Sequence, residues 1–209
     1  MNKKKQLWLL AGGNGAGKST FYRTRLAPSG LSFVNADIIA KLLYPQAPEA
    51  HSYRAARLAE QMRLQLLRQG RSFCFETVFS HPSKIDFVAH AKALGYEIVL
   101  VFIHLCDPAL NQARIAQRVS EGGHHVPDDK VISRIPRTLK LIKKTLPLCD
   151  HVYTLDNSRA DNPFQQLAVI HNGRSTFRHD VMFDWCRELL TDYGAKNKIC
   201  NEHGDLSDA

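Results

Sequence analysis

Short apolar runs alternate along the chain with segments whose apolar residues recur at helical spacing. The runs are rich in β-branched and aromatic residues and predict strands, and the segments between them predict helices. We expect strands at residues 6–11, 31–35, 72–76, 96–105 and 151–155, and helices at 18–26, 38–43, 49–69, 80–94, 108–120 and 128–146. This order is typical of a parallel sheet joined by crossover helices. The pattern therefore predicts an open α/β fold with about five parallel strands and helices on both faces.

The run from Tyr96 to Leu105 is almost continuously apolar, so we expect this strand at the centre of the sheet, buried on both faces. Residues 165–172, followed by Gly173, predict one arm of a hairpin with an Asn-Gly turn, and residues 181–192 predict an amphipathic helix. We interpret residues 1–193 as a single domain that ends in this short hairpin and helix. Residues 194–209 are polar and are expected to form a disordered tail.

Composition narrows the class of protein. An apolar content of 44% and a charged content of 23% are typical of a globular protein, and no apolar stretch is long enough to cross a bilayer. The first residues contain no apolar signal segment, so we expect a cytoplasmic protein without a membrane partner. The five cysteines form no C-x-x-C pair, which indicates reduced thiols, and no His/Cys spacing indicates a zinc site.

The net charge of +8 has two readings. Basic residues bind nucleic acid, but they also clamp the phosphates of small molecules. Charge alone does not decide between these partners. Few aromatic residues interleave with the basic ones, so nucleic acid is the less favoured partner.

The segment from Gly12 to Ser19 matches the phosphate-binding pattern G-x-x-x-x-G-K-[ST] and directly follows the first expected strand. Its glycines allow successive backbone N–H groups to point into one cavity, Lys18 reaches the β- and γ-phosphates, and Ser19 offers a hydroxyl to Mg²⁺. A merely structural turn needs neither Lys nor Ser after its last glycine. We therefore expect this phosphate-binding loop (P-loop) to bind ATP and Mg²⁺. The expected nucleotide-binding residues are Gly12, Gly13, Asn14, Gly15, Ala16, Gly17, Lys18, Ser19 and Thr20.

Two carboxylates follow the second and third strands, at the sheet edge where ligands bind in parallel α/β folds. Asp37 is a candidate catalytic base or Mg²⁺ ligand, because a kinase needs a carboxylate near the acceptor hydroxyl. The alternative is that Asp37 only caps the helix that starts at Ile38. Glu76 ends an apolar strand and is expected to face a polar cleft, where it would bind substrate hydroxyls or a metal-bound water. The alternative is a salt-bridged strand terminus.

Residues 114–146 place basic side chains on both sides of a Gly-Gly turn. A helix–loop–helix of this composition is similar to the lid of small-molecule kinases, whose arginines fold over the phosphates and neutralise transition-state charge. The alternative is a solvated basic face. The residues behind the lid prediction are Arg114, Arg118, Gly122, Gly123, His124, His125, Lys130, Arg134 and Arg137.

Together these residues resemble the zeta-toxin-like P-loop kinases, including compact relatives often labelled predicted ATPases. The resemblance covers roughly residues 6–158, and its most specific part is the G-G-H-x-V-P signature at 122–127. Its other parts are the P-loop, Asn35-Ala36-Asp37, Glu76-Thr77, Arg118, Arg134 and Asp156-Asn157-Ser158.

The resemblance implies a P-loop NTPase-type fold and transfer of the ATP γ-phosphate to a hydroxyl of a UDP-amino-sugar such as UDP-N-acetylglucosamine. It also implies the toxin of a toxin–antitoxin pair, with a small antitoxin protein as partner. The implied catalytic residues are Lys18, Asp37, Arg118 and Arg134, the implied Mg²⁺ ligands are Ser19 and Asp37, and the implied substrate-binding residues are Asn35, Glu76, Thr77 and His125. Two alternatives stay open. One is a P-loop kinase for another acceptor, such as a nucleic-acid 5′-hydroxyl, an antibiotic or another nucleotide, and the other is a nucleotide-switch ATPase.

Overall fold

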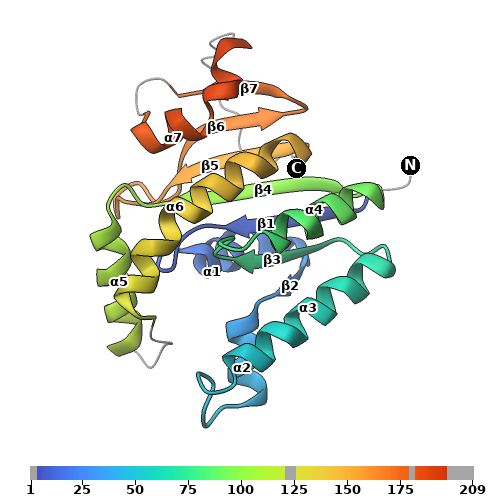
Figure 1. Cartoon of the computed structure of the whole chain (residues 1–209), viewed down its shortest axis with the longest axis vertical. Helices are drawn as coiled ribbons and strands as arrows, with labels where there is room; N and C mark the ends of the chain where they lie inside the picture. The colour runs from blue at the N-terminus through green and yellow to red at the C-terminus, as the bar shows by residue number, and fades with distance from the viewer. Residues whose placement is uncertain (1–3, 121–125, 179–181, 197–209) are drawn as a thin grey trace.

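The computed structural model describes residues 4–120, 126–178 and 182–196. Within these residues the strands form one sheet of seven strands in the order β2-β3-β1-β4-β5-β6-β7 (Figure 1). The strands are β1 (Gln6–Ala11), β2 (Ser32–Val34), β3 (Phe73–Thr77), β4 (Glu97–His104), β5 (His151–Asp156), β6 (Gln165–His171) and β7 (Arg174–Phe177). The helices are α1 (Lys18–Phe21), α2 (Ala36–Leu43), α3 (Ser52–Arg68), α4 (Ser83–Ala93), α5 (Pro108–Ser120), α6 (Asp128–Thr145) and α7 (Asp184–Leu189).

The parallel part of the sheet is the one that the sequence predicts. The strands β1 to β5 pair in parallel, and β4 lies in the middle of the sheet between β1 and β5. The predicted hairpin, β6 and β7, pairs antiparallel with β5 and extends the same sheet, which therefore has seven strands instead of about five. The predicted α/β fold is confirmed, with this difference in strand number.

Helices cover both faces of the sheet, as predicted. Alternate residues of β4 pack on opposite sides, with Leu100 in the core formed by α3, α4, α6 and α7 and Val101 in the core formed by α1. The residue after α1 begins a π-helical turn, Tyr22–Leu26, followed by a 3-10 turn, Ala27–Ser29. The predicted helix 18–26 is therefore irregular. The Thr24 hydroxyl donates to the Thr20 carbonyl at 2.9 Å, a side-chain bond of the kind that bends helices.

Helix α6 has its predicted bounds to within one residue, and the C-terminal helix differs from its predicted form. Helix α6 continues through Pro136, which lacks a backbone N–H, and the Arg137 guanidinium donates to the Ser133 carbonyl at 3.0 Å, one turn back. The C-terminal helix is shorter than predicted, because α7 ends at Leu189 and a 3-10 turn, Thr191–Lys196, follows it. Of the predicted disordered tail, residues 197–209 lie outside the described residues.

The parallel strands point their carboxyl ends toward one edge of the sheet, and α5 stands beside that edge (Figure 1). The P-loop follows β1 at this edge. Asn35, the residue after β2, and Thr77, the last residue of β3, lie at the same edge. Ligands bind at this edge in parallel α/β sheets. Every helix among the described residues is too short or too polar to cross a membrane.

Candidate active site

The P-loop adopts a conformation that only glycine accepts at several positions. Gly12, Gly15 and Gly17 have φ angles of 150°, 77° and 94°, in the region that other residues rarely occupy. A Cβ at Gly12 would lie 2.1 Å from the backbone oxygen of Ile103 in β4, and one at Gly17 would lie 2.5 Å from Asn157 Nδ2. The loop is therefore a tightly packed cradle of backbone groups. Such a cradle fits the phosphates of a nucleotide.

We expect Gly12→Ala to lower the free energy of unfolding by roughly 2 to 5 kcal/mol, because the Ile103 backbone cannot move away from the added Cβ. Gly30→Ala is the matched control. Gly30 also has a positive φ, 74°, but no atom lies within 4 Å of its Cβ position, so the control should lose about 1–2 kcal/mol. Urea unfolding of both variants gives the comparison, and equal losses would contradict the close approach of the loop to β4.

Two asparagines from distant elements hold the P-loop in place. The amide nitrogen of Asn111, in α5, donates to the Asn14 carbonyl at 2.6 Å, and that of Asn157, after β5, donates to the Ala16 carbonyl at 2.9 Å. Both side chains are buried, and Phe164 N donates to Asn157 Oδ1 at 3.2 Å. The loop is thus fixed from outside before any ligand binds, which reduces the entropy that binding would cost.

Lys18 lies at the floor of the cradle and is only 6% exposed. Its ammonium donates to the carbonyls of Gly12 and Gly13, at 3.0 and 2.8 Å, and lies 3.7 Å from Glu76. Burial lowers the pKa of Lys18, while the negative charges of Glu76 and Asp37 act in the opposite direction. The lysine is therefore held by neighbouring oxygens in a desolvated position, where a phosphate is a strong additional partner.

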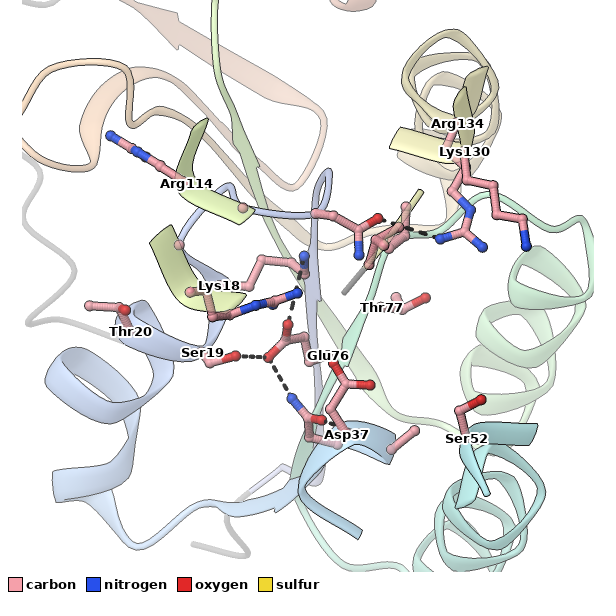
Figure 2. Close-up of a pocket in the computed structure, with 18 of the residues that line it drawn as sticks. Lys18, Ser19, Thr20, Asp37, Ser52, Glu76, Thr77, Arg114, Lys130 and Arg134 are labelled. Atoms are coloured by element: carbon pink, nitrogen blue, oxygen red, sulfur yellow. Dashed lines mark hydrogen bonds and ion pairs between the residues drawn. The ribbon is translucent and has the colours of Figure 1, made fainter. Parts of the chain in front are cut away.

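Glu76 connects the P-loop to the end of β2. Its Oε2 accepts a hydrogen bond from Ser19 Oγ at 2.6 Å and another from Asn35 Nδ2 at 2.7 Å (Figure 2). The sequence suggests substrate binding or a metal-bound water for Glu76, and its contact with Ser19 places it beside the expected magnesium ligand. Mg²⁺ is typically bound by one or two carboxylates, a hydroxyl, water and substrate phosphates. The pair of Ser19 and Glu76 fits that donor set, and no cluster of three or more His, Cys, Asp or Glu ligands occurs in the described part of the chain.

Asp37 does not cap α2, which was its alternative role. The cap is Asn35, whose Oδ1 accepts hydrogen bonds from the backbone N–H groups of Asp37 and Ile38 at 2.8 and 3.2 Å. The Asp37 side chain is exposed and lines the cleft between the P-loop and Ser52, the first residue of α3 (Figure 2). Its carboxylate is therefore available to a ligand in the cleft.

Thr77 has a local structural partner as well as a position in the cleft. Its hydroxyl accepts a hydrogen bond from Phe79 N at 2.9 Å, and Phe79 has a positive φ of 59°. Thr77 thereby stabilises an unusual turn after β3 while it lines the cleft. Its predicted role in binding substrate remains a prediction.

The predicted lid supplies basic side chains from two helices. Arg114 and Arg118 of α5 and Lys130 and Arg134 of α6 all line the cleft, and Arg134 approaches Asn14 of the P-loop at 3.5 Å. Arg118 lies close enough to Lys18 to lower the pKa of that lysine. Arg137 lines no part of the cleft and bonds to Ser133 instead. His124 and the predicted substrate-binding residue His125 lie outside the described residues, with Gly122 and Gly123.

The cleft has a volume of about 1050 Å³ and is strongly cationic. Its lining includes nine basic side chains, Lys18, Arg57, Arg63, Lys84, Arg114, Arg118, Lys130, Arg134 and Arg159, and three carboxylates, Asp37, Glu60 and Glu76. Sequence reasoning missed the contributions of α3 and α4, namely Arg57, Glu60, Arg63 and Lys84. Charged residues on helices usually face solvent, so no sequence signal distinguishes these four.

Comparisons with known proteins agree with this site and fold. A family model described as an AAA domain (AAA_33) matches residues 7–141, and the chain belongs to this family. An uncharacterised protein of Haemophilus influenzae is 31% identical over 135 residues, which are 61% of this chain and 96% of that protein.

Solved structures of low sequence identity share the fold. A chain of the AvrRxo1-ORF1:AvrRxo1-ORF2 complex matches with a TM-score of 0.69 in the crystal form with sulphate ions (16% identity) and 0.68 in the form with ATP (18% identity). These matches cover 92% and 99% of this chain, and 64% and 68% of the other, so the present chain spans about two thirds of that protein's length. The PezAT chromosomal toxin-antitoxin system of Streptococcus pneumoniae matches with a TM-score of 0.60 and 14% identity, over 92% of this chain and 79% of that one. The resemblance to zeta-toxin-like P-loop kinases is thereby confirmed at the level of the fold.

Proposed function

We propose that the protein is an ATP-dependent phosphotransferase that moves the γ-phosphate of ATP to an alcohol group of a small molecule. The observation that carries this proposal is the position of Asp37. Its carboxylate lines the cleft next to the P-loop, and Asn35 performs the capping that Asp37 would otherwise explain. A carboxylate placed beside the phosphate cradle is the group that a kinase uses to accept the proton of the attacking hydroxyl.

The other residues have complementary roles in this proposal. Lys18 and the P-loop amides bind the β- and γ-phosphates, and Arg118 and Arg134 of the lid neutralise charge on the transferring group. Ser19, Glu76 and Asp37 would hold Mg²⁺, which supplies positive charge to the phosphates when bound. Asn35 orients Glu76 through the 2.7 Å hydrogen bond between them. Closure of the lid would exclude water and favour transfer over hydrolysis.

We further propose that the acceptor is a UDP-amino-sugar such as UDP-N-acetylglucosamine, and that the protein is the toxin of a toxin–antitoxin pair. Two facts support this finer proposal. The P-loop, Asp37, Glu76-Thr77 and lid residues match the zeta-toxin pattern, and the chain shares its fold with a toxin–antitoxin system of Streptococcus pneumoniae. A small antitoxin that blocks the nucleotide end of the cleft would be the protein partner.

The test is mass spectrometry of reactions that contain the protein, MgATP and UDP-N-acetylglucosamine, with a panel of other acceptors in parallel. The panel includes a nucleic acid with a free 5′-hydroxyl, aminoglycoside antibiotics and other nucleotides. We expect a UDP-sugar heavier by one phosphoryl group, formed at the same rate as ADP. A phosphorylated product from another acceptor would replace the UDP-sugar proposal, while ADP without any phosphorylated acceptor would favour an ATPase.

A further inference from the structure

The side of the cleft formed by α3 and α4 carries basic side chains that none of the roles above uses. Arg57 and Arg63 of α3 and Lys84 of α4 line this side, and the carboxylate beside them is Glu60. They share the cleft with Asp37 and with Ser52, the first residue of α3. This is the part of the cleft that the acceptor molecule would occupy.

Arg63 is buried in a way that fixes its orientation. Its side chain is 6% exposed, and its guanidinium lies over two aromatic rings, 5.0 Å from the centre of Phe75 and 5.4 Å from that of Phe87. These rings stand almost perpendicular to each other, at 87°, so they contact the guanidinium from two directions. Among the described residues, Arg63 Nε is buried without a hydrogen-bond partner. A guanidinium that is held rigidly at the wall of a cleft is a suitable partner for a planar or tetrahedral oxyanion.

Lys84 reinforces the positive charge beside Arg63. It is half-buried, and its pKa is lowered first by burial and then by the charge of Arg63. Burial also lowers the pKa of Arg63, and Glu60 acts in the opposite direction on both groups. Glu60 is exposed, so water screens much of the attraction between its carboxylate and these two cations. Arg63 and Lys84 are thus two neighbouring, partly desolvated cations, and a bound anion would reduce the repulsion between them.

We propose that Arg63 and Lys84 form a phosphate-binding subsite for the acceptor, which therefore carries a phosphate or diphosphate group in addition to the hydroxyl that reacts. This inference rests on the proposed function, because the subsite and Asp37 share one cleft. The two negative charges of a phosphate dianion match these two cations better than the one charge of a carboxylate would. The exposed Arg57, on α3 with Arg63, adds a third positive charge. Arg63 and Lys84 bind and orient the acceptor and take no part in proton or phosphoryl transfer.

The test is isothermal titration calorimetry on protein whose P-loop is saturated with the magnesium complex of AMP-PNP, so that added phosphates cannot bind there. The titrants are UDP, inorganic pyrophosphate and uridine. We expect UDP to bind at least tenfold more tightly than uridine, and pyrophosphate to bind measurably. Pyrophosphate binding without a further gain for UDP would assign the subsite to a diphosphate of any origin, whereas a gain for UDP would assign it to a nucleoside diphosphate. If neither anion binds, or if uridine binds as tightly as UDP, the subsite does not exist.

Variants then connect the binding to the two side chains. Arg63→Met keeps an unbranched apolar side chain against Phe75 and Phe87. Lys84→Met is the safer substitution for the fold, because Lys84 is only half-buried. Each is expected to weaken binding of UDP, or of pyrophosphate if that is the ligand, by tenfold or more, which corresponds to one charge-assisted hydrogen bond. Arg68→Gln is the matched control, because Arg68 is exposed on the same α3 helix and does not line the cleft. Unchanged anion binding in a folded Lys84→Met variant would overturn the proposal.

Kinetics separate this inference from the proposed function. In both variants the KM of the phosphorylated acceptor should rise at least tenfold, with kcat and the KM of ATP nearly unchanged. If no acceptor in the panel is phosphorylated but the anion binds as described, the kinase proposal fails and the subsite stands. If phosphoryl transfer occurs equally well in wild type and in both variants, the subsite fails and the kinase proposal stands.

Discussion

Replacement of Lys18 by alanine is expected to reduce phosphoryl transfer by at least about 100- to 1000-fold, the usual cost of removing one preorganised charged donor from a reaction centre. Lys18 is the buried cation at the floor of the P-loop, and its ammonium is already aligned on the Gly12 and Gly13 carbonyls. The rate is measured as the phosphorylated product formed from the acceptor that the mass-spectrometric panel selects. ATP affinity, measured with a fluorescent analogue, should fall as well, because Lys18 binds the phosphates in the ground state too.

The same variant should remain folded. Burial lowers the pKa of Lys18, which means that the folded state bears a desolvation cost for this ammonium, and the substitution removes that cost. Lys18→Met, which fills the space that alanine leaves empty, is a second variant, and it removes the same donor from the Gly12 and Gly13 carbonyls. Lys41→Ala is the charge-matched control, since Lys41 is exposed on α2 and lies outside the cleft. Normal transfer by a folded Lys18 variant would contradict the role of the P-loop.

The P-loop was predictable because its chemistry is local. The eight residues Gly12–Ser19 are contiguous, and their glycines indicate a backbone with positive φ angles, a conformation typical of phosphate-binding loops. The strands β1 to β5 were predictable for a similar reason, since a nearly continuous apolar run indicates burial on both faces of a sheet. The helix after the P-loop was less predictable, because the spacing of its apolar residues does not distinguish an α-helical turn from the π-helical turn found at Tyr22–Leu26.

Contacts between distant residues were not predictable from the sequence. Ser19 and Glu76 are far apart in the chain, and only the adjacency of β1 and β3 brings them within 2.6 Å. Asn157 and Asn111 reach the P-loop in the same way, from the segment after β5 and from α5. In the sequence, Arg63 is an ordinary charged residue on an amphipathic helix. Only the structure shows that its guanidinium lies over the rings of Phe75 and Phe87. Periodicity shows which face of a helix is apolar, but it does not show what a buried cation on that helix faces.

The corner between β2 and α2 illustrates how structure resolves an ambiguity that sequence leaves open. Asn35 and Asp37 are both favoured residues at helix starts, so composition cannot decide which of them caps α2. The hydrogen bonds assign the cap to Asn35 and leave the carboxylate of Asp37 without that duty. Substitution of Asp37 should therefore affect catalysis with little effect on stability, whereas substitution of Asn35 should remove both the cap and the hydrogen bond to Glu76.

Asp37→Asn is expected to lower kcat by about 100- to 10,000-fold, the usual range for loss of a positioned general base, with ATP affinity and unfolding free energy nearly unchanged. Asn35→Ala, by contrast, should cost about 1 kcal/mol of stability through the lost cap. A magnesium titration distinguishes the two roles predicted for Asp37. If it holds Mg²⁺, high magnesium should restore much of the activity of Asp37→Asn, and if it is the base, no magnesium concentration should do so. Full activity in Asp37→Asn at ordinary magnesium, or loss of folding without a catalytic defect in the folded fraction, would contradict both roles. For a base, kcat and kcat/KM should fall together. Such a joint fall would show that the carboxylate acts in the transition state, which is the behaviour of a kinase base.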